Sequence, residues 1–373
     1  MRALLRLVMP EMRPCRDKPQ YSHNFSKNFR RLSRRVCHNT ERTTRGSRMR
    51  ILAVDDDVFI LELLPVVLSD FGYDDVAVTT SAQQALSMIE SDDRGFDCLF
   101  LDIHMSGMDG IELCRRVRAM PGYKTTPIVM LTSMTDKAHI DWAFAAGATD
   151  YVTKPFDVTE LGARVRVAEK LHAAHNAALE TPAEEPVEPV EAGMGGKPGF
   201  DAAQRLEEVE GTVESEALAN YLGQLSKARL YNSNIFAIKI DQAEVIHAQT
   251  GHSEYYEVLK AVGGAIGDAL GRRGFFLMSY TGGGVFVCIF QSEQTESRDA
   301  LERDVQDAIE QRAPDLHGAV AAPITVSAGE PLKPHISSAK RSARIFRVAI
   351  ARAEGKHEEK AALLQDQAFR RVI

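Results

Sequence analysis

Short apolar runs alternate with helical patterns over the first part of the chain. Four runs of consecutive apolar residues predict buried strands, at Ile51–Val54, Cys98–Leu101, Ile128–Leu131 and Tyr151–Val152. Apolar residues recur at helical spacing in the segments Phe59–Phe71, Ala82–Ile89, Ile111–Met120, Ala138–Ala146 and Thr159–Leu171. Strands and helices that alternate in this way predict an α/β fold. We expect a doubly wound parallel sheet in the flavodoxin-like order, with ligands at the carboxyl ends of its strands.

A second α/β pattern follows a segment that cannot bury a core. Residues 180–199 are rich in Pro, Glu and Gly, which predicts a linker. A polar helical stretch follows at 202–228, and strands are then predicted at Ile235–Ile240, Phe275–Ser279, Val285–Phe290 and Ile324–Ser327. Helices are predicted at Glu254–Leu270, Arg298–Gln311 and Ser337–Ala353. We therefore divide the chain into a tail at 1–48, a first domain at 49–172, a linker at 173–203, a second domain at 204–357 and a C-terminal tail at 358–373.

Composition favours a protein of two domains that folds in a reducing compartment. The chain has 373 residues, of which 44% are hydrophobic and 26% charged, within the ordinary range for globular proteins. Its five cysteines form no CxxC pair and no His/Cys cluster at zinc-ligand spacing. No stretch approaches the roughly 18 uninterrupted apolar residues of a membrane helix. We therefore expect a cytoplasmic protein without a membrane span.

Charge is distributed unevenly along the chain. Residues 1–48 carry 13 Lys and Arg against three acids, a net charge of +10, so the rest of the chain carries −17. Such a tail could bind nucleic acid or an anionic membrane surface. Met49 stands directly before the first predicted strand, however, so a start codon assigned too far upstream is an alternative explanation.

Acidic residues follow two of the predicted strands of the first domain. Asp55 and Asp56 come directly after the first strand, and Asp102 comes directly after the strand Cys98–Leu101. These two strands are neighbours in a doubly wound sheet, so their carboxylates should converge on one pocket. Like charges in such a pocket repel, and a hard divalent cation such as Mg²⁺ relieves the repulsion. A carboxylate there could attack a phosphorus atom.

Two further residues at strand ends suit the same chemistry. Thr132 ends the third strand and offers a hydroxyl, and Lys154 follows the fourth strand and offers a compact positive charge to a phosphoryl oxygen. Each feature alone has a simpler explanation, because acids after strands are often helix N-caps and a single Lys is usually solvated. Together they favour a phosphate-handling site.

The first domain resembles the receiver domains of two-component response regulators over about 120 residues. Four stretches in the family's order carry the resemblance: Ile51-Leu-Ala-Val-Asp-Asp-Asp57, Leu101-Asp-Ile-His-Met-Ser-Gly-Met-Asp-Gly110, Pro127-Ile-Val-Met-Leu-Thr-Ser133 and Ala146-Gly-Ala-Thr-Asp-Tyr-Val-Thr-Lys-Pro-Phe156. The resemblance implies that Asp102 accepts a phosphoryl group from a sensor histidine kinase or a phosphotransfer protein. It also implies a Mg²⁺ site formed by Asp55, Asp56, Asp102 and the backbone carbonyl of His104, in which Asp56 and Asp102 bind the ion directly.

The resemblance assigns further roles near the phosphoacceptor. It implies that Lys154 contacts the phosphate and is joined to Pro155 by a cis peptide bond, and that Thr132 and Tyr151 are the switch pair. Phosphorylation would draw the Thr132 hydroxyl inward and let Tyr151 follow, which would change the surface around the last two helices. The simplest readout is altered dimerisation. The chain departs from the family at Ser106, where proline is usual, which bears on the rigidity of that loop.

The second domain resembles diguanylate cyclase (GGDEF) domains and, through them, the nucleotidyl-cyclase fold. Five weaker signals carry this resemblance: Phe236-Ala-Ile-Lys-Ile-Asp241, Gly251-His252, Tyr280-Thr-Gly-Gly-Gly-Val-Phe286, Ile324-Thr-Val-Ser-Ala-Gly329 and Ala351-Arg-Ala-Glu-Gly-Lys356. That family joins two GTP molecules with the help of Mg²⁺ ions held by carboxylates.

The residues that this resemblance aligns with the cyclase site are altered. The first metal aspartate position reads Lys239, the acidic pair of the signature loop reads Gly284 and Val285, and the guanine-contacting positions read His247 and Tyr256. A cation or an apolar side chain cannot replace a metal-binding carboxylate. We therefore expect no enzyme activity from a degenerate domain that serves as a binding or dimerisation module.

These observations give one leading hypothesis and two alternatives. The leading hypothesis is a response regulator of a phosphorelay, phosphorylated on Asp102 in a Mg²⁺-dependent reaction, with a kinase or phosphotransfer protein and a second copy of the chain as expected partners. The first alternative is an active diguanylate cyclase that makes cyclic di-GMP from GTP. The second is nucleic-acid binding through the basic tail, although we expect nucleic acid to be an improbable partner.

Overall fold

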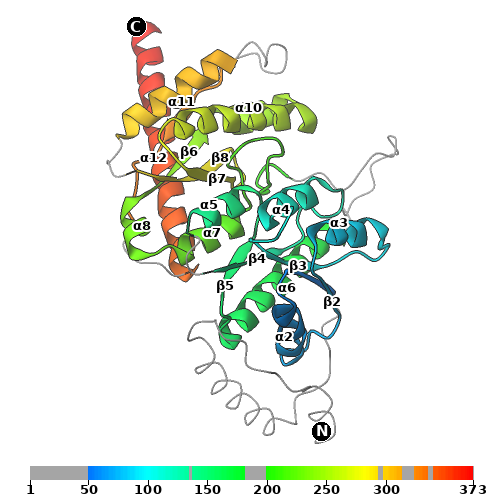
Figure 1. The fold of residues 1–373 in the computed structure, drawn as a ribbon. Coiled ribbons are helices and arrows are strands. Elements are labelled where there is room, and N and C mark those ends of the chain that lie inside the picture. Colours follow the sequence, from blue (N-terminus) through cyan, green and yellow to red (C-terminus); the bar gives the residue numbers. More distant parts are fainter. Residues whose placement is uncertain are drawn as a thin grey trace, which may run out of the picture. The chain divides into compact units, whose positions relative to one another are not determined.

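A computed structural model describes residues 49–133, 137–180, 199–292, 297–312, 323–334 and 339–372, which belong to one compact unit, Ser47–Ile373. The basic tail at 1–48 and most of the predicted linker lie outside the described residues. In the first domain strands and helices alternate as expected (Figure 1). The elements are β1 Ile51–Val54, α2 Val58–Ser69, β2 Val76–Thr79, α3 Ala82–Ser91, β3 Cys98–Asp102, α4 Gly110–Ala119, β4 Ile128–Ser133, α5 Lys137–Ala145, β5 Asp150–Lys154 and α6 Val158–Glu180.

The sheet of the first domain is parallel and has the strand order β2-β1-β3-β4-β5. This confirms the predicted flavodoxin-like, doubly wound arrangement. The sequence patterns missed β2, because Val76–Thr79 is a short edge strand of which only Thr79 is buried. The helix predicted at Thr159–Leu171 is also too short, because α6 continues beyond Leu171 to Glu180.

Two hydrophobic cores cover the two faces of this sheet. In β1 alternate side chains point to opposite faces, as strand geometry requires. Ile51 and Ala53 pack in a cluster with residues of α2 and α6, whereas Leu52 and Val54 pack in a cluster with residues of α3 and α4. Strands buried on both faces read as continuous apolar runs. This is why the three central strands β1, β3 and β4 were visible in the sequence.

The second domain contains an antiparallel sheet with the strand order β7-β8-β6-β9. Its elements are α7 Ser215–Gln224, α8 Lys227–Asn232, β6 Ser233–Ile240, α9 Ala243–Gln249, α10 His252–Gly271, β7 Phe276–Tyr280, β8 Val285–Gln291, α11 Arg298–Arg312, β9 Val326–Ala328 and α12 Ala339–Val372. The domain is therefore α/β, as predicted, and its relation to the cyclase fold stays a prediction.

Two helix predictions in this domain need correction. The stretch at 202–228 is not one helix, because α7 begins only at Ser215 and the chain turns at Gly211 with a φ of +74°. The last predicted helix does not end at Ala353: α12 continues to Val372 and includes residues 358–372. The prediction of Ala353 as an end followed the apolar spacing, which stops before the charged turns that continue the helix.

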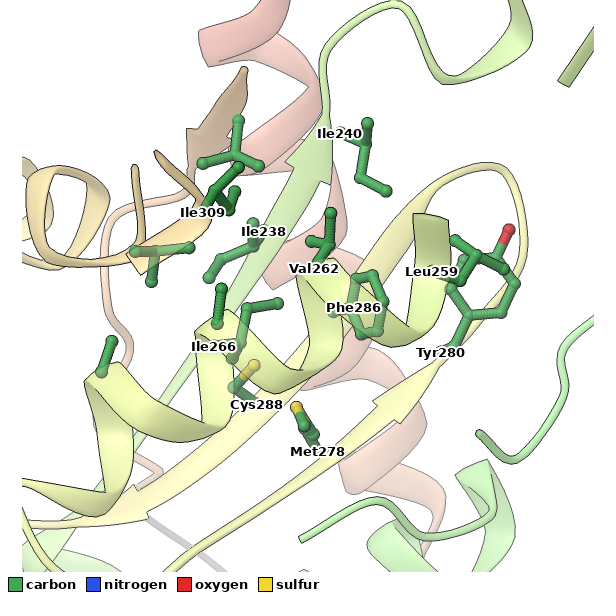
Figure 2. Close-up of a cluster of buried hydrophobic side chains, with 14 of the residues drawn as sticks. Ile238, Ile240, Leu259, Val262, Ile266, Met278, Tyr280, Phe286, Cys288 and Ile309 are labelled. Atoms are coloured by element: carbon green, nitrogen blue, oxygen red, sulfur yellow. The ribbon is translucent and has the colours of Figure 1, made fainter. Parts of the chain in front are cut away.

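The core of the second domain lies on both faces of its sheet. Ile238 and Ile240 of β6 pack against Val262 and Ile266 of α10, and Figure 2 shows these side chains directed at one another. On the opposite face, residues of β6 and β8 pack against α7 and α12. Cys288 lies inside the first of these cores, and Cys98 and Cys114 are buried in the first domain. These three described cysteines therefore act as small core residues.

Within the described part of the chain, no helix is both long enough and apolar enough to cross a membrane.

Candidate phosphoacceptor site

Three carboxylates converge at the carboxyl edge of the parallel sheet. Asp102 is the last residue of β3, and Asp55 follows β1, which pairs with β3 through Val54 and Leu101. One carboxylate oxygen from each of Asp55, Asp56 and Asp102 lies within 4.8 Å of the others. Asp55 and Asp102 are buried and Asp56 is exposed, so the cluster opens to solvent on one side.

Lys154 joins the cluster from the end of β5. Its Nζ lies 2.6 Å from Asp102 Oδ1 and 2.6 Å from Asp55 Oδ2. Burial tends to lower the pKa of this ammonium, but its hydrogen bonds to the two carboxylates outweigh that effect and raise the pKa. Lys154 therefore stays charged between the two buried acids.

Burial also changes the two acids. It raises the pKa of Asp102 to about 6, although the hydrogen bond and the charge of Lys154 act in the opposite direction. Burial likewise raises the pKa of Asp55, although the hydrogen bonds from Lys154 and from the Asp57 backbone N–H act to lower it. Asp102 is therefore mainly ionised at neutral pH, but burial makes its negative charge unfavourable. A cation in the pocket would stabilise that charge.

The residues of the pocket fit a hard divalent cation. Carboxylate and carbonyl oxygens are the ligands that Mg²⁺ prefers, and three carboxylates in reach of one point supply more negative charge than Lys154 balances. His104 follows β3 in an exposed position, where its ring makes an edge-to-face contact with His139 at 5.0 Å. This contact involves the imidazole ring, whereas the resemblance gives the metal role to the His104 backbone carbonyl.

Thr132 and Tyr151 lie on adjacent strands. Thr132 is fully buried in β4, and its hydroxyl donates to the Ser133 carbonyl at 3.2 Å. The Tyr151 hydroxyl instead donates to the carbonyl of Gln224 in α7 at 3.5 Å, and its ring packs edge-on against Phe144. Burial raises the pKa of Tyr151, so the phenol keeps its proton.

Some of the acids near the pocket cap helices, as the simpler explanation requires. Asp57 is the N-cap of α2 and accepts from the Phe59 backbone N–H at 2.9 Å. Asp109 is the N-cap of α4 and accepts from the Glu112 backbone N–H at 2.7 Å. Both are exposed, which separates them from the buried pair Asp55 and Asp102.

Gly110 supports the pocket in a way that the sequence analysis missed. A Cβ at this position would lie 2.0 Å from the Asp102 carbonyl oxygen, and the Gly110 N–H donates to the Ile103 carbonyl at 3.0 Å. The turn after β3 therefore closes tightly on the backbone of Asp102. The Asp109-Gly110 pair before a helical pattern was the available signal.

The match to known proteins covers the residues of this pocket. Residues 51–166 match the family model of the response regulator receiver domain. They are a response regulator receiver domain. The peptide bond between Lys154 and Pro155 in this receiver domain is cis, as the resemblance implied.

Curated relatives share the receiver domain. The chain is 44% identical over 119 residues to a protein named DNA-binding response regulator MtrA, from Mycobacterium tuberculosis, covering 32% of this chain and 50% of the relative. It is 38% identical over 116 residues to the Transcriptional regulatory protein YvrH of Bacillus subtilis, covering 31% and 47%. The chain thus spans about half the length of these relatives. Their names do not support our expectation that nucleic acid is an improbable partner, which stays untested.

Solved structures also match this part of the chain. A putative response regulator from Chloroflexus aurantiacus is 39% identical, covers 33% of this chain and 99% of its own, and gives a TM-score of 0.31. The chemotaxis response regulator CheY4 of Vibrio cholerae is 32% identical, with coverages of 32% and 98% and a TM-score of 0.30.

The altered cyclase-like positions of the second domain lie in two places. Lys239 pairs with Val285 across β6 and β8, and its Nζ donates to the Gly283 carbonyl at 3.1 Å. The ammonium thus binds the turn that precedes β8. Gly284 has a φ of +76°, and a Cβ there would lie 2.3 Å from the Ala243 Cβ, which explains a glycine at this position without any ligand.

His247 and Tyr256 contact a segment that precedes α7. The His247 ring lies 5.2 Å from the ring of Phe200, and the Tyr256 hydroxyl accepts from the Glu207 backbone N–H at 2.9 Å. The Phe200 carbonyl in turn accepts from the Gly283 N–H at 3.0 Å. Residues 200–207 therefore lie against both groups of altered positions.

A buried polar network in the second domain was not predicted. Asp241, directly after β6, accepts from Ser327 Oγ at 2.7 Å and from Thr325 Oγ1 at 2.9 Å, and His357 Nδ1 lies 2.9 Å from it. Lys360 lies 3.8 Å from the same carboxylate. The network satisfies a carboxylate that is 7% exposed and ties α12 to the sheet. The sequence signal for this network was an acidic residue, Asp241, directly after a predicted strand.

Proposed function

We propose that this chain is a two-component response regulator that accepts a phosphoryl group on Asp102. The observation that carries the proposal is the position of Lys154 Nζ, 2.6 Å from both Asp102 and Asp55, in a pocket where three carboxylates meet. The donor would be a sensor histidine kinase or a phosphotransfer protein, because that is the source which the receiver resemblance implies.

The residues of the pocket divide the work of the transfer. Asp102 supplies the attacking oxygen, which bonds to phosphorus as the bond from phosphorus to the donor nitrogen breaks and that nitrogen takes up a proton. Lys154 is placed to move from the carboxylates to an oxygen of the incoming group. Asp55, Asp56, Asp102 and the His104 carbonyl would hold Mg²⁺. When bound, this ion neutralises the phosphoryl oxygens.

A small phosphodonor tests the proposal. Full-length protein incubated with acetyl phosphate and Mg²⁺ should gain the mass of one phosphoryl group, because a receiver pocket needs no kinase contact for the chemical step. Chelation of Mg²⁺ should prevent the gain. Intact-protein mass spectrometry measures both results. An unchanged mass with Mg²⁺, or an equal gain in the presence of the chelator, would contradict the proposal.

For the second domain we propose a non-catalytic binding or dimerisation module. Lys239 in place of a metal-binding aspartate supports this, since its ammonium donates to the Gly283 carbonyl and places a positive charge at the turn that the cyclase resemblance gives to metal and phosphate. Residues 200–207, which lie against His247 and Tyr256, support it further.

Incubation of the protein with GTP and Mg²⁺ distinguishes this module from an active diguanylate cyclase. We expect no cyclic di-GMP, because no carboxylate stands at the aligned metal positions Lys239, Gly284 and Val285. Chromatography of the nucleotides measures the outcome. Sustained formation of cyclic di-GMP would establish the cyclase alternative.

A further inference from the structure

A cavity of about 850 Å³ lies where the receiver domain meets the second domain. Its walls come from the C-terminal halves of α4, α5 and α6, and from residues 203–216 and the end of β7 in the second domain. The described residues that line it do not include Asp55, Asp56, Asp102 or Lys154, so the cavity is separate from the acidic pocket. Its volume is in the range of cavities that hold small molecules.

Two neighbouring arginines line this cavity without a carboxylate partner. Arg118 is 8% exposed, and its guanidinium donates to the backbone carbonyls of Gly147 at 2.9 Å and Thr126 at 2.6 Å. A Cβ at Gly147 would lie 2.5 Å from Arg205 Nη1 and 3.1 Å from Arg118 Nε, so the two guanidinium groups are neighbours. Arg205 makes no hydrogen bond or ion pair with any residue that the structure describes. Adjacent guanidinium groups favour a carboxylate, which can accept two parallel hydrogen bonds from one of them.

Three glutamate side chains of the same cavity also lack partners. Glu210, Glu214 and Glu216 form no side-chain hydrogen bond and no ion pair within the described part of the chain. Glu214 precedes α7 as its N-cap residue, but its side chain does not cap the helix. Burial raises the pKa of Glu214, although the charges of Arg118 and His175 act to lower it. A cation in the cavity would therefore stabilise this carboxylate.

The unpaired charges leave a small negative excess in the cavity. The other Arg, Lys and Glu side chains of the lining already have partners of opposite charge: Lys124 with Glu207, Arg115 with Glu112 and Glu208 with Lys260. Three unpaired carboxylates thus stand against the two guanidinium groups of Arg118 and Arg205. His175 adds a polar atom, because its Nδ1 is buried and has no hydrogen-bond partner among the described residues. A ligand that satisfies these groups carries one negative charge and more than one positive charge.

We propose that this cavity binds a basic α-amino acid. Arg205 binds the carboxylate of the ligand, and the charge of Arg118 strengthens that contact. Glu214, the least exposed of the three acids, binds the α-ammonium group, and the side-chain cation lies against the exposed Glu210 and Glu216. A ligand without one of these charges would leave a partly buried group unpaired, which weakens binding. The proposal does not depend on phosphorylation of Asp102.

Isothermal titration calorimetry of the full-length protein with matched small molecules tests the site. The probes are L-lysine and L-arginine, of which at least one should bind. L-norleucine lacks the side-chain ammonium of lysine, and cadaverine lacks its carboxylate, so each should bind at least about tenfold more weakly than L-lysine. Binding of neither basic amino acid would overturn the proposal. Binding of L-norleucine or cadaverine as tightly as L-lysine would overturn it as well.

Two variants locate the site in the cavity. Arg205→Gln and Glu214→Gln remove one charge each and no described side-chain hydrogen bond, so the fold should be kept, and each should weaken binding of the basic amino acid by at least about tenfold. Arg205→Gln should leave the weak binding of cadaverine unchanged, because that probe has no carboxylate. The matched control is Arg312→Ala, which removes an Arg–Asp pair with Asp268 away from the cavity and should bind as the parent protein does. Parent-like binding by either Gln variant, or an equal loss for cadaverine in Arg205→Gln, would overturn the proposal.

Discussion

Asp102→Asn is expected to abolish phosphorylation by acetyl phosphate and Mg²⁺. The substitution keeps the size of the side chain but removes the charged oxygen that attacks phosphorus, and an amide is a poor nucleophile. Asp102 is only 5% exposed, and Lys154 lies between its carboxylate and that of Asp55, so no exposed neighbour can take its place without moving. Incorporation measured by intact mass should fall below detection.

The matched control for this substitution is Asp109→Asn. Asp109 lies seven residues further along the same loop but caps α4 rather than lining the pocket. Asparagine is as good an N-cap as aspartate, so the fold should be kept. This variant should gain phosphate as the parent protein does. Loss of phosphorylation in both variants would point to the loop and not to Asp102 as the cause.

Gly110→Ala is expected to destabilise the receiver domain and to disturb the phosphoacceptor together. The new Cβ would lie 2.0 Å from the Asp102 carbonyl oxygen and 2.8 Å from its carbonyl carbon. No rotamer change relieves a clash between Cβ and backbone, so the turn or the end of β3 must shift. We expect a loss of about 3 kcal/mol or more in the free energy of unfolding. Denaturant unfolding measures it, and phosphorylation of the folded fraction should be slower.

Gly107→Ala serves as the comparison in the same loop. Gly107 has a φ of +84°, but a Cβ there would have no atom within 4 Å. The substitution therefore costs only the backbone strain of a left-handed residue, about 1–2 kcal/mol. Equal losses for the two variants would contradict the steric role of Gly110.

The convergence of the pocket could be predicted because it depends on topology alone. In a parallel sheet the carboxyl ends of neighbouring strands meet, so residues after β1, β3 and β5 must lie close together once these strands are recognised. The apolar runs of β1 and β3 are continuous because both faces of these strands are buried. The edge strand β2 lacked that signal, since Val76, Ala77 and Val78 are not buried.

The contact of α7 and α8 with α5 and β5 could not be predicted, because it depends on the fit of two surfaces. In the sequence, Phe144 is an apolar residue at helical spacing and reads as part of the receiver core. Only the structure shows that it packs with α7 of the second domain. Likewise Asp141 and Arg229 are 88 positions apart in the chain, and neither is in a motif. Patterns within one element carry no information on such pairs.

Localisation of the phosphate within the protein tests the central claim most directly. The protein is phosphorylated with acetyl phosphate and Mg²⁺, and tandem mass spectrometry of its peptides identifies the modified residue. The account predicts one phosphoryl group on Asp102, at the end of β3 beside Lys154. A phosphate on any other residue, or a phosphorylated protein in which the peptide containing Asp102 is unmodified, would contradict it.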